Sequence, residues 1–297
     1  MKLLGMSAST RAWGNCEAAI RLALVSAADQ GAETEFIRLP DLEIAPCRGC
    51  FKCLSDAKTC ALTDDLWDLL ERISSADALV VASPVYFGLP PAILVGLLDR
   101  LLAVAARDQS GDRRRYAVTV TVMGNRAWRG LAEPIVNITA SLLGFELAES
   151  LSVVAEGPGE VLADSETVES LKYWGGRLVG GGPHAARGPS GATLQCPTCR
   201  SDFFRIESRS TLVCPVCGEA GDLSAYLRDG TFLSTGSERR WGLVWLRQHV
   251  EDWIKPSVRR YALSRRQVSR NLAELRRLSA LKLGHEALDR GRVKPWD

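Results

Sequence analysis

Residues 1–17, MKLLGMSASTRAWGNCE, join an apolar run to a polar loop that opens a helical pattern. The run at 2–6 predicts a short buried strand, and the pattern from 17 to about 30 predicts a helix. Hydroxyls, the Arg11 guanidinium and free backbone N–H groups would meet at the start of this helix, where the helix dipole favours anions. Judged by spacing alone, such a loop either binds a phosphate or only caps its helix.

The alternation of strand and helix continues to about residue 180. Apolar runs predict four more strands, at 33–39, 78–82, 116–123 and 146–155, and helical patterns lie between and after them, at 64–74, 91–106, 130–143 and 164–179. Five strands that alternate with helices indicate an α/β protein with a doubly wound parallel sheet. Ligands of such sheets bind beyond the carboxyl ends of the strands. We therefore expect a ligand at the loops that follow the first, third and fourth strands.

The nine cysteines are the least ordinary part of the composition. The chain has 297 residues with 46% hydrophobic and 24% charged content, which suits one large domain and a smaller one. It shows no signal-peptide pattern and no apolar run of about 18 residues, so we expect a cytoplasmic protein without a membrane span. Disulfides are rare in cytoplasmic proteins, so the cysteines are expected to have another role. Eight cysteines form two sets that predict two metal centres, namely Cys47, Cys50, Cys53 and Cys60, and then Cys196, Cys199, Cys214 and Cys217.

The first set has the spacing C-x2-C-x2-C-x6-C within residues 47–60. Three thiolates on one tight loop can bind three corners of a [4Fe–4S] cube, and the fourth closes the last corner. Zinc normally takes two separated pairs instead. We predict a [4Fe–4S] cluster, with zinc, another cluster or a bare thiol site as alternatives. Arg48 and Lys52 flank the cysteines, either as exposed loop charge or as charges that raise the cluster potential.

The second set reads CPTC at 196–199 and CPVC at 214–217. Two such knuckles give a tetrahedral site of four thiolates. A module of this size depends on its metal to fold. We predict a ribbon with structural Zn²⁺, and a single rubredoxin-type iron is the alternative.

The last part of the chain is basic. From 255 to 297 there are 12 Lys or Arg and 4 acidic residues, so this part carries a net charge of +8. The whole chain carries +2, so the preceding residues carry about −6. Helical patterns lie near 241–253 and 265–282, and Trp241, Trp245 and Trp253 would share one buried helix face. The arginine-rich stretch from Arg259 to Arg277 is either a solvated helix face or a docking surface. For docking, an acidic electron carrier such as a ferredoxin is the partner we favour. Nucleic acid is disfavoured because aromatic residues are scarce among the arginines.

Three motifs resemble the family of NAD(P)H-dependent FMN reductases and iron–sulfur flavoproteins. They are the loop Ser9-x-Arg11-x-x-Gly14-Asn15-Cys16, the segment SPVYFG at 83–88 followed by Asp99-Arg100, and the compact cysteine loop ahead of paired acids at 64–65. The resemblance covers about residues 1–180 and implies a flavodoxin-like fold with bound FMN. We therefore assign residues 1–180 to an FMN domain with the cysteine loop at 47–60. Composition and cysteine spacing, rather than the resemblance, predict a Gly- and Pro-rich linker at 181–193, the metal ribbon at 194–225 and a basic helical tail at 226–297. The ribbon is not a general feature of this family.

The same resemblance assigns the residues that would hold FMN. The residues that would bind the phosphate are Ser9, Arg11, Asn15 and Cys16. Cys16 replaces the usual Thr, which removes a hydroxyl bond, and the alternative for it is a small core thiol. Two loops would bind the flavin ring. One contains Pro84, Val85, Tyr86, Phe87 and Gly88, and the other contains Gly124, Asn125 and Trp128. Trp128 would either stack near the flavin or pack in a subunit interface.

The predicted activity is that of an oxidoreductase in which electrons pass between FMN and the [4Fe–4S] cluster, to or from a carrier or a small-molecule acceptor. One alternative is an NAD(P)H-dependent FMN or quinone reductase with an auxiliary cysteine loop. Another is a redox-sensing regulatory protein that uses the ribbon and the basic tail. The resemblance implies a homo-oligomer, either a dimer or a tetramer. No residue is assigned as catalytic, because no acid–base or nucleophile constellation is present.

Overall fold

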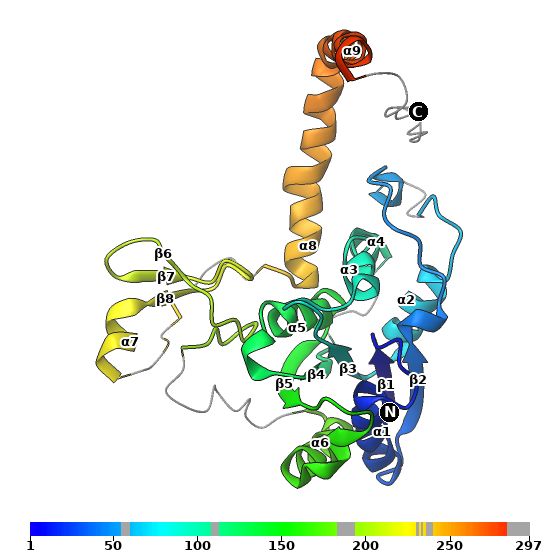
Figure 1. Ribbon diagram of the computed structural model, residues 1–297, viewed down its shortest axis with the longest axis vertical. Coiled ribbons are helices and arrows are strands. Elements are labelled where there is room, and N and C mark those ends of the chain that lie inside the picture. Colours follow the sequence, from blue (N-terminus) through cyan, green and yellow to red (C-terminus); the bar gives the residue numbers. More distant parts are fainter. Residues whose placement is uncertain are drawn as a thin grey trace. The chain divides into compact units, whose positions relative to one another are not determined.

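The computed structural model (Figure 1) describes most of the chain, namely residues 1–54, 60–107, 113–182, 194–229, 232, 234–235 and 240–283. Its contacts divide the chain into two units, residues 1–246 and 247–297. The expected linker lies outside the described residues except for Gly181 and Gly182.

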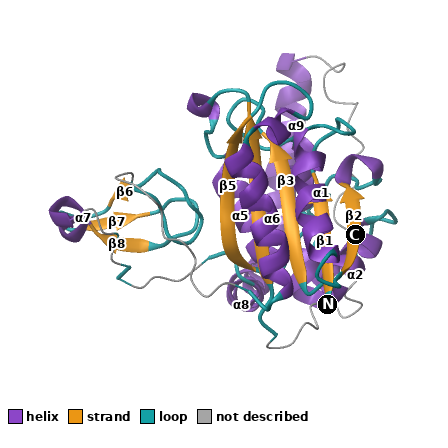
Figure 2. Cartoon of the chain, turned by 90° about the horizontal axis from the view of Figure 1, so that it is seen from below, coloured by secondary structure: helices purple, strands orange, loops and turns teal. Residues whose placement is uncertain are grey.

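A five-stranded parallel sheet lies at the centre of the first unit (Figures 1 and 2). Its strands are β1 (Lys2–Ser7), β2 (Glu33–Arg38), β3 (Ala78–Pro84), β4 (Tyr116–Met123) and β5 (Glu146–Val154), in the order β2-β1-β3-β4-β5. All four pairings are parallel. The strand order reverses between β1 and β3, as it does in flavodoxin-like sheets. The predicted fold class is therefore confirmed.

Helices cover both faces of this sheet (Figure 2). One face carries α1 (Asn15–Ala28) and α6 (Ser165–Val179), and the other carries α2 (Leu66–Ser75), α3 (Ala92–Leu98), α4 (Leu102–Arg107) and α5 (Ala132–Leu142). The central strands feed both cores, because neighbouring side chains point to opposite faces. Leu79 and Val81 enter one apolar cluster, and Val80 and Ala82 enter the other.

The helix expected at 91–106 is two helices in the structure. α3 ends at Leu98 and α4 begins at Leu102. The backbone between them makes tighter bonds, for example from the Arg100 N–H to the Leu97 carbonyl at 3.0 Å. The break places the Arg100 side chain in a buried ion pair with Asp64.

The second cysteine set belongs to a small antiparallel sheet of β6 (Arg205–Ile206), β7 (Thr211–Val213) and β8 (Ala220–Asp222), followed by α7 (Leu223–Asp229). Beyond it, α8 (Leu243–His249), a π-helical turn (Val250–Ile254) and α9 (Lys255–Leu283) follow in sequence. Pro256 has no backbone N–H to donate to the preceding turn, which accounts for the π-helical hydrogen bonding just before it.

The tryptophans of this region do not share one buried face. Trp241 and Trp245 are partly buried, pack against the sheet core and lie 5.1 Å apart between ring centroids. Trp253 is 59% exposed. The expectation that all three are core residues is therefore wrong for Trp253. In the described part of the chain, no helix combines the length and the apolar character needed to cross a bilayer.

Candidate functional site

Three loops leave the carboxyl ends of the neighbouring strands β1, β3 and β4, and therefore meet at one edge of the sheet. Each loop carries an exposed aromatic side chain. Trp13 is 70% exposed after β1, Phe87 is fully exposed after β3, and Trp128 is 67% exposed after β4. Large aromatic side chains left in water at a strand-order switch point indicate a site for a flat, mostly apolar ligand.

The loop after β1 is shaped by its own side chains. The Ser9 hydroxyl accepts the Arg11 N–H at 3.2 Å, and the Glu17 carboxylate accepts the Trp13 N–H at 2.9 Å. Several backbone N–H groups of this loop and of the first residues of α1 make no hydrogen bond within the described residues, namely those of Thr10, Ala12, Gly14, Asn15 and Cys16. Free N–H groups at a helix N-terminus form an anion site. The loop therefore has the donors that a phosphate needs.

Glu17 shapes this loop, although its place in the sequence does not mark it as a site residue. Burial alone would raise its pKa, but hydrogen bonds from the Trp13 N–H and from Arg21, together with nearby positive charge, hold the pKa of Glu17 below its usual range. The carboxylate therefore stays ionised and fixes the loop. Its position, three residues after the capping Gly14, is the one at which a capping-box carboxylate stands.

The side chains of Asn15 and Cys16, two of the predicted phosphate ligands, make other contacts in the structure. The Asn15 amide donates to the Gly157 carbonyl at 2.9 Å and accepts the Val161 N–H at 3.2 Å, so it anchors the loop that follows β5. Cys16 is 2% exposed, and burial raises the pKa of its thiol to about 12, which fits the core alternative. Either residue can reach a phosphate through its backbone N–H.

The loop after β3 makes a tight turn at its tip. Tyr86 and Leu89 exchange two backbone hydrogen bonds, of 2.8 and 3.0 Å, around Phe87 and Gly88. Both central residues have positive φ, 52° and 75°. This is a type I′ pattern, which Gly tolerates and Phe does not favour. The strained Phe87 is held out in solvent at the edge where the ligand is expected.

A close backbone approach locks this turn to the loop after β4. The Leu131 N–H donates to the Gly88 carbonyl at 2.7 Å. A Cβ atom on Gly130 would lie only 2.4 Å from the Gly88 oxygen, so no other residue fits there without a shift of the backbone. Gly130 and Gly88 therefore fix the two ring loops relative to each other.

We expect Gly130→Ala to weaken FMN binding by at least about tenfold, because the clash would separate the two loops that border the ring. The measurement is an FMN titration of the apoprotein followed by flavin fluorescence. Gly31→Ala is the matched control, since Gly31 also has positive φ but has open space around its Cβ position. Equal affinities for the two variants would show that the close approach does not matter to the site.

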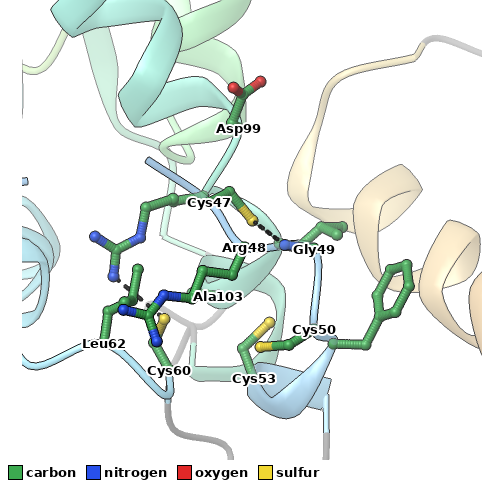
Figure 3. Close-up of a pocket in the computed structure, with 12 residues that line it drawn as sticks. Cys47, Arg48, Gly49, Cys50, Cys53, Cys60, Leu62, Asp99 and Ala103 are labelled. Atoms are coloured by element: carbon green, nitrogen blue, oxygen red, sulfur yellow. Dashed lines mark hydrogen bonds between the residues drawn. The ribbon is translucent and has the colours of Figure 1, made fainter. Parts of the chain in front are cut away.

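The four cysteines of the first set line one cavity (Figure 3). Their sulfur atoms point toward a common space, although residues 55–59 of this loop lie outside the described part of the chain. Burial, and then the nearby thiols of Cys60, Cys47 and Cys50, raise the pKa of Cys53 to about 11. Two N–H groups already point at sulfur, from Gly49 to Cys47 at 3.4 Å and from Arg100 to Cys60 at 3.2 Å. Four thiols with N–H donors around one cavity fit an iron–sulfur cluster.

The second set is built for a single ion. All four sulfurs lie within 4.8 Å of one another and are fully buried. The Cys196–Cys217 and Cys199–Cys214 sulfur pairs are 3.4 and 3.6 Å apart, close to the edge of about 3.8 Å that a zinc tetrahedron with 2.3 Å bonds requires. The two knuckles match each other, because Arg200 and Gly218 follow them with φ of 63° and 78°. Among the described residues, the loop cysteines do not gather this tightly, as suits a cube rather than one ion.

The ribbon contacts α5 and the loop after β4, both of which belong to the same unit. The Asn137 amide on α5 donates to the Cys199 carbonyl at 2.9 Å, inside the first knuckle. Arg129, in the loop after β4, forms ion pairs with Asp202 of the ribbon and with Glu133, the latter at 3.2 Å. These contacts were not predictable from the sequence, because the partners lie far apart along the chain.

Comparison with known proteins places the first part of the chain in a family. The model of the family described as NADPH-dependent FMN reductase matches residues 1–155. An iron–sulfur flavoprotein of Methanocaldococcus jannaschii is 33% identical over 183 residues, which cover 62% of this chain and 85% of that protein. An iron–sulfur flavoprotein of Methanosarcina thermophila is 36% identical over 126 residues, which cover 42% of this chain and 65% of that protein.

A solved flavone reductase structure superposes with a TM-score of 0.68 and covers 92% of this chain and 96% of its own. Its identity of 20% shows a shared fold alone. The family match, by contrast, spans more than half of the chain and includes the loops after β1, β3 and β4 described above. The chain belongs to the NADPH-dependent FMN reductase family and is an FMN-dependent oxidoreductase.

Proposed function

We propose that this oxidoreductase passes electrons between FMN at the sheet edge and a [4Fe–4S] cluster held by Cys47, Cys50, Cys53 and Cys60. The observation that carries the proposal is the cavity lined by all four thiols, which adjoins the segment after α3. FMN supplies paired and single electron transfers, and a cluster carries electrons singly. The two chemistries therefore complement each other. The relatives from Methanocaldococcus jannaschii and Methanosarcina thermophila are named iron–sulfur flavoproteins, which agrees with this combination.

The position of α3 supports transfer between the two sites. Its seven residues, Ala92–Leu98, span about 10 Å. The ring loop ends at Leu89, just before this helix, and Arg100, which contacts Cys60, comes just after it. One short helix therefore links the proposed flavin site to the proposed cluster site.

The chain's own residues have distinct duties in this proposal. The free N–H groups at the start of α1 and the Arg11 side chain bind the phosphate, and Glu17 holds their loop in place. The turn at Phe87 and the segment at Trp128 border the flavin ring and limit water access to it. Gly88 and Gly130 hold these two borders together.

For the ribbon we propose a structural Zn²⁺ bound by Cys196, Cys199, Cys214 and Cys217. The buried four-thiolate set and its sulfur spacing support zinc. A single iron is the alternative metal for the same ligands. Because both cysteine sets need reduced thiols, we also propose a cytoplasmic location.

For partners we propose a second copy of the chain, in a dimer or tetramer, and an acidic electron carrier such as a ferredoxin. Support for the carrier comes from α9, where most described arginines are exposed, among them Arg259, Arg260, Arg265, Arg266 and Arg270. Complementary charge raises the association rate of redox partners, and this rate enhancement falls as the salt concentration rises. We also propose that the domains of the chain end at residues 180, 193 and 225.

The direct test is an anaerobic analysis of iron, sulfide and flavin with a visible spectrum. We expect about four iron and four acid-labile sulfide atoms at the loop, in addition to FMN. In stopped-flow mixing, a chemically reduced low-potential one-electron carrier should bleach the flavin rapidly and NADPH alone should bleach it slowly. A protein without acid-labile sulfide would contradict the proposal.

The second candidate function is that of an NAD(P)H-dependent FMN or quinone reductase, in which the cysteine loop is auxiliary. The observation that favours it is the family match itself, to NADPH-dependent FMN reductases. In the same stopped-flow experiment this candidate predicts rapid bleaching by NADPH alone. It also predicts that turnover continues when the cluster is absent.

A further inference from the structure

Arg100 is a buried cation that points at the cysteine cavity. Its side chain is fully buried, just after α3. One terminal nitrogen forms an ion pair with Asp64 and donates to the Ala45 carbonyl at 3.1 Å, and the other donates to the Cys60 sulfur at 3.2 Å. A buried guanidinium needs such partners, because an unpaired charge inside a protein is costly. One of the partners it has taken is a proposed cluster ligand.

The pair of Arg100 and Asp64 also ties the two ends of the cysteine loop together. Ala45 lies two residues before Cys47, and its N–H donates to the Asp64 carboxylate at 2.9 Å while its carbonyl accepts from Arg100. Asp64 lies four residues after Cys60 and accepts the Leu66 N–H at 3.3 Å at the start of α2. The loop therefore leaves and re-enters the fold at one buried ion pair.

We infer that Arg100 is a positioning residue that also raises the reduction potential of the cluster, and that Asp64 opposes it. The inference rests on the proposed function, because it concerns the cluster proposed for this cavity. Reduction adds one electron to the cluster, and the added negative charge is stabilised by a nearby cation and by N–H donors to its sulfur ligands. A nearby carboxylate has the opposite effect.

Burial separates Arg100 from the other cations of the loop. Arg48 lines the same cavity (Figure 3) but is exposed to water, as is Lys52. Charges in water are strongly screened, whereas a charge enclosed in protein is screened less and acts more strongly on its neighbours. Sequence alone draws attention to Arg48 and Lys52, because they stand between the cysteines. The structure shifts this role to Arg100, which lies 40 residues after Cys60.

The test is the midpoint potential of the cluster in an anaerobic titration followed by electron paramagnetic resonance. Arg100→Met should lower the potential so that the reduced-to-oxidised ratio falls at least about tenfold, which is 59 mV for one electron. Asp64→Asn should raise the potential, because it removes the opposing charge and keeps a side chain of the same shape. Arg48→Met is the matched control, and its ratio should change by less than about threefold.

The opposite signs distinguish an electrostatic role from mere structural damage. Unchanged potentials in both buried variants, shifts of the same sign, or an equal shift in Arg48→Met would each overturn the inference. If Arg100→Met fails to hold the cluster, Arg100→Lys replaces it and should keep a potential above that of Arg100→Gln. Wild-type protein without acid-labile sulfide would defeat the proposed function and this inference with it, whereas unmoved potentials in cluster-loaded variants defeat the inference alone.

Discussion

Cys50→Ser should remove the iron and sulfide of the loop almost completely while FMN stays bound. Cys50 lines the cavity with the other three thiols, and a serine hydroxyl is a poor ligand for cluster iron beside three thiolates. The FMN loops follow β1, β3 and β4, whereas Cys50 lies in the segment between β2 and α2. The expected result is a fall from about four iron atoms to none, with an unchanged flavin spectrum.

The control for this experiment is Cys16→Ser, which removes a thiol from the core rather than from the loop. It should keep the loop iron and sulfide, whatever it does to stability. Loss of FMN together with the cluster in Cys50→Ser would mean that the two sites form one cooperative structure. Wild-type protein with zinc in the loop and no acid-labile sulfide would show that the cluster assignment is wrong.

The central fold was predictable because its signals are local. Each buried strand is a short apolar run, and each helix between them repeats apolar residues at helical spacing. The break at 99–101 was not predictable in this way, since the apolar pattern continues through it. The break coincides with a long-range contact, the pairing of Arg100 with Asp64, which lies 36 residues away in sequence.

The candidate sites were predictable to the extent that their residues lie together in sequence. Both cysteine sets and the phosphate loop have fixed short spacings, and the structure brings each cysteine set together. The side-chain duty of Asn15 was not visible, because its partners at Gly157 and Val161 come more than 140 residues later. The role of Gly130 was hidden for the same reason, as it depends on how closely a second loop approaches.

The ribbon shows the same limit. A Gly- and Pro-rich linker suggests two modules that move independently. The structure instead places the first knuckle against α5, through Asn137 and Cys199, and against the loop after β4, through Asp202 and Arg129. Trp241 packs on the ribbon as well, with its indole N–H donating to the Val216 carbonyl. The zinc proposed for the ribbon therefore supports part of the proposed flavin site.

Cys214→Ser should unfold the ribbon and weaken FMN binding as well. Loss of one thiolate removes a structural zinc site, and a three-stranded sheet this small has little core besides its metal. Asn137 and Arg129 would then lose their partners at Cys199 and Asp202. Freeing Arg129 loosens the loop that carries Trp128, so we expect FMN affinity to fall by about tenfold. The measurements are zinc content, limited proteolysis around 194–225 and an FMN titration.

Asp202→Asn separates the contact from the metal, because it removes the ion pair and leaves the four cysteines in place. It should keep its zinc and resistance to protease, and show only part of the loss in FMN affinity, since a partly exposed ion pair contributes about 1 kcal/mol or less. If Cys214→Ser loses its metal and its fold but binds FMN as the wild type does, the ribbon is independent of the flavin site. If the ribbon instead holds one iron with a reversible potential, and its loss slows reoxidation of the flavin, the four thiolates serve as a rubredoxin-like relay rather than as a support.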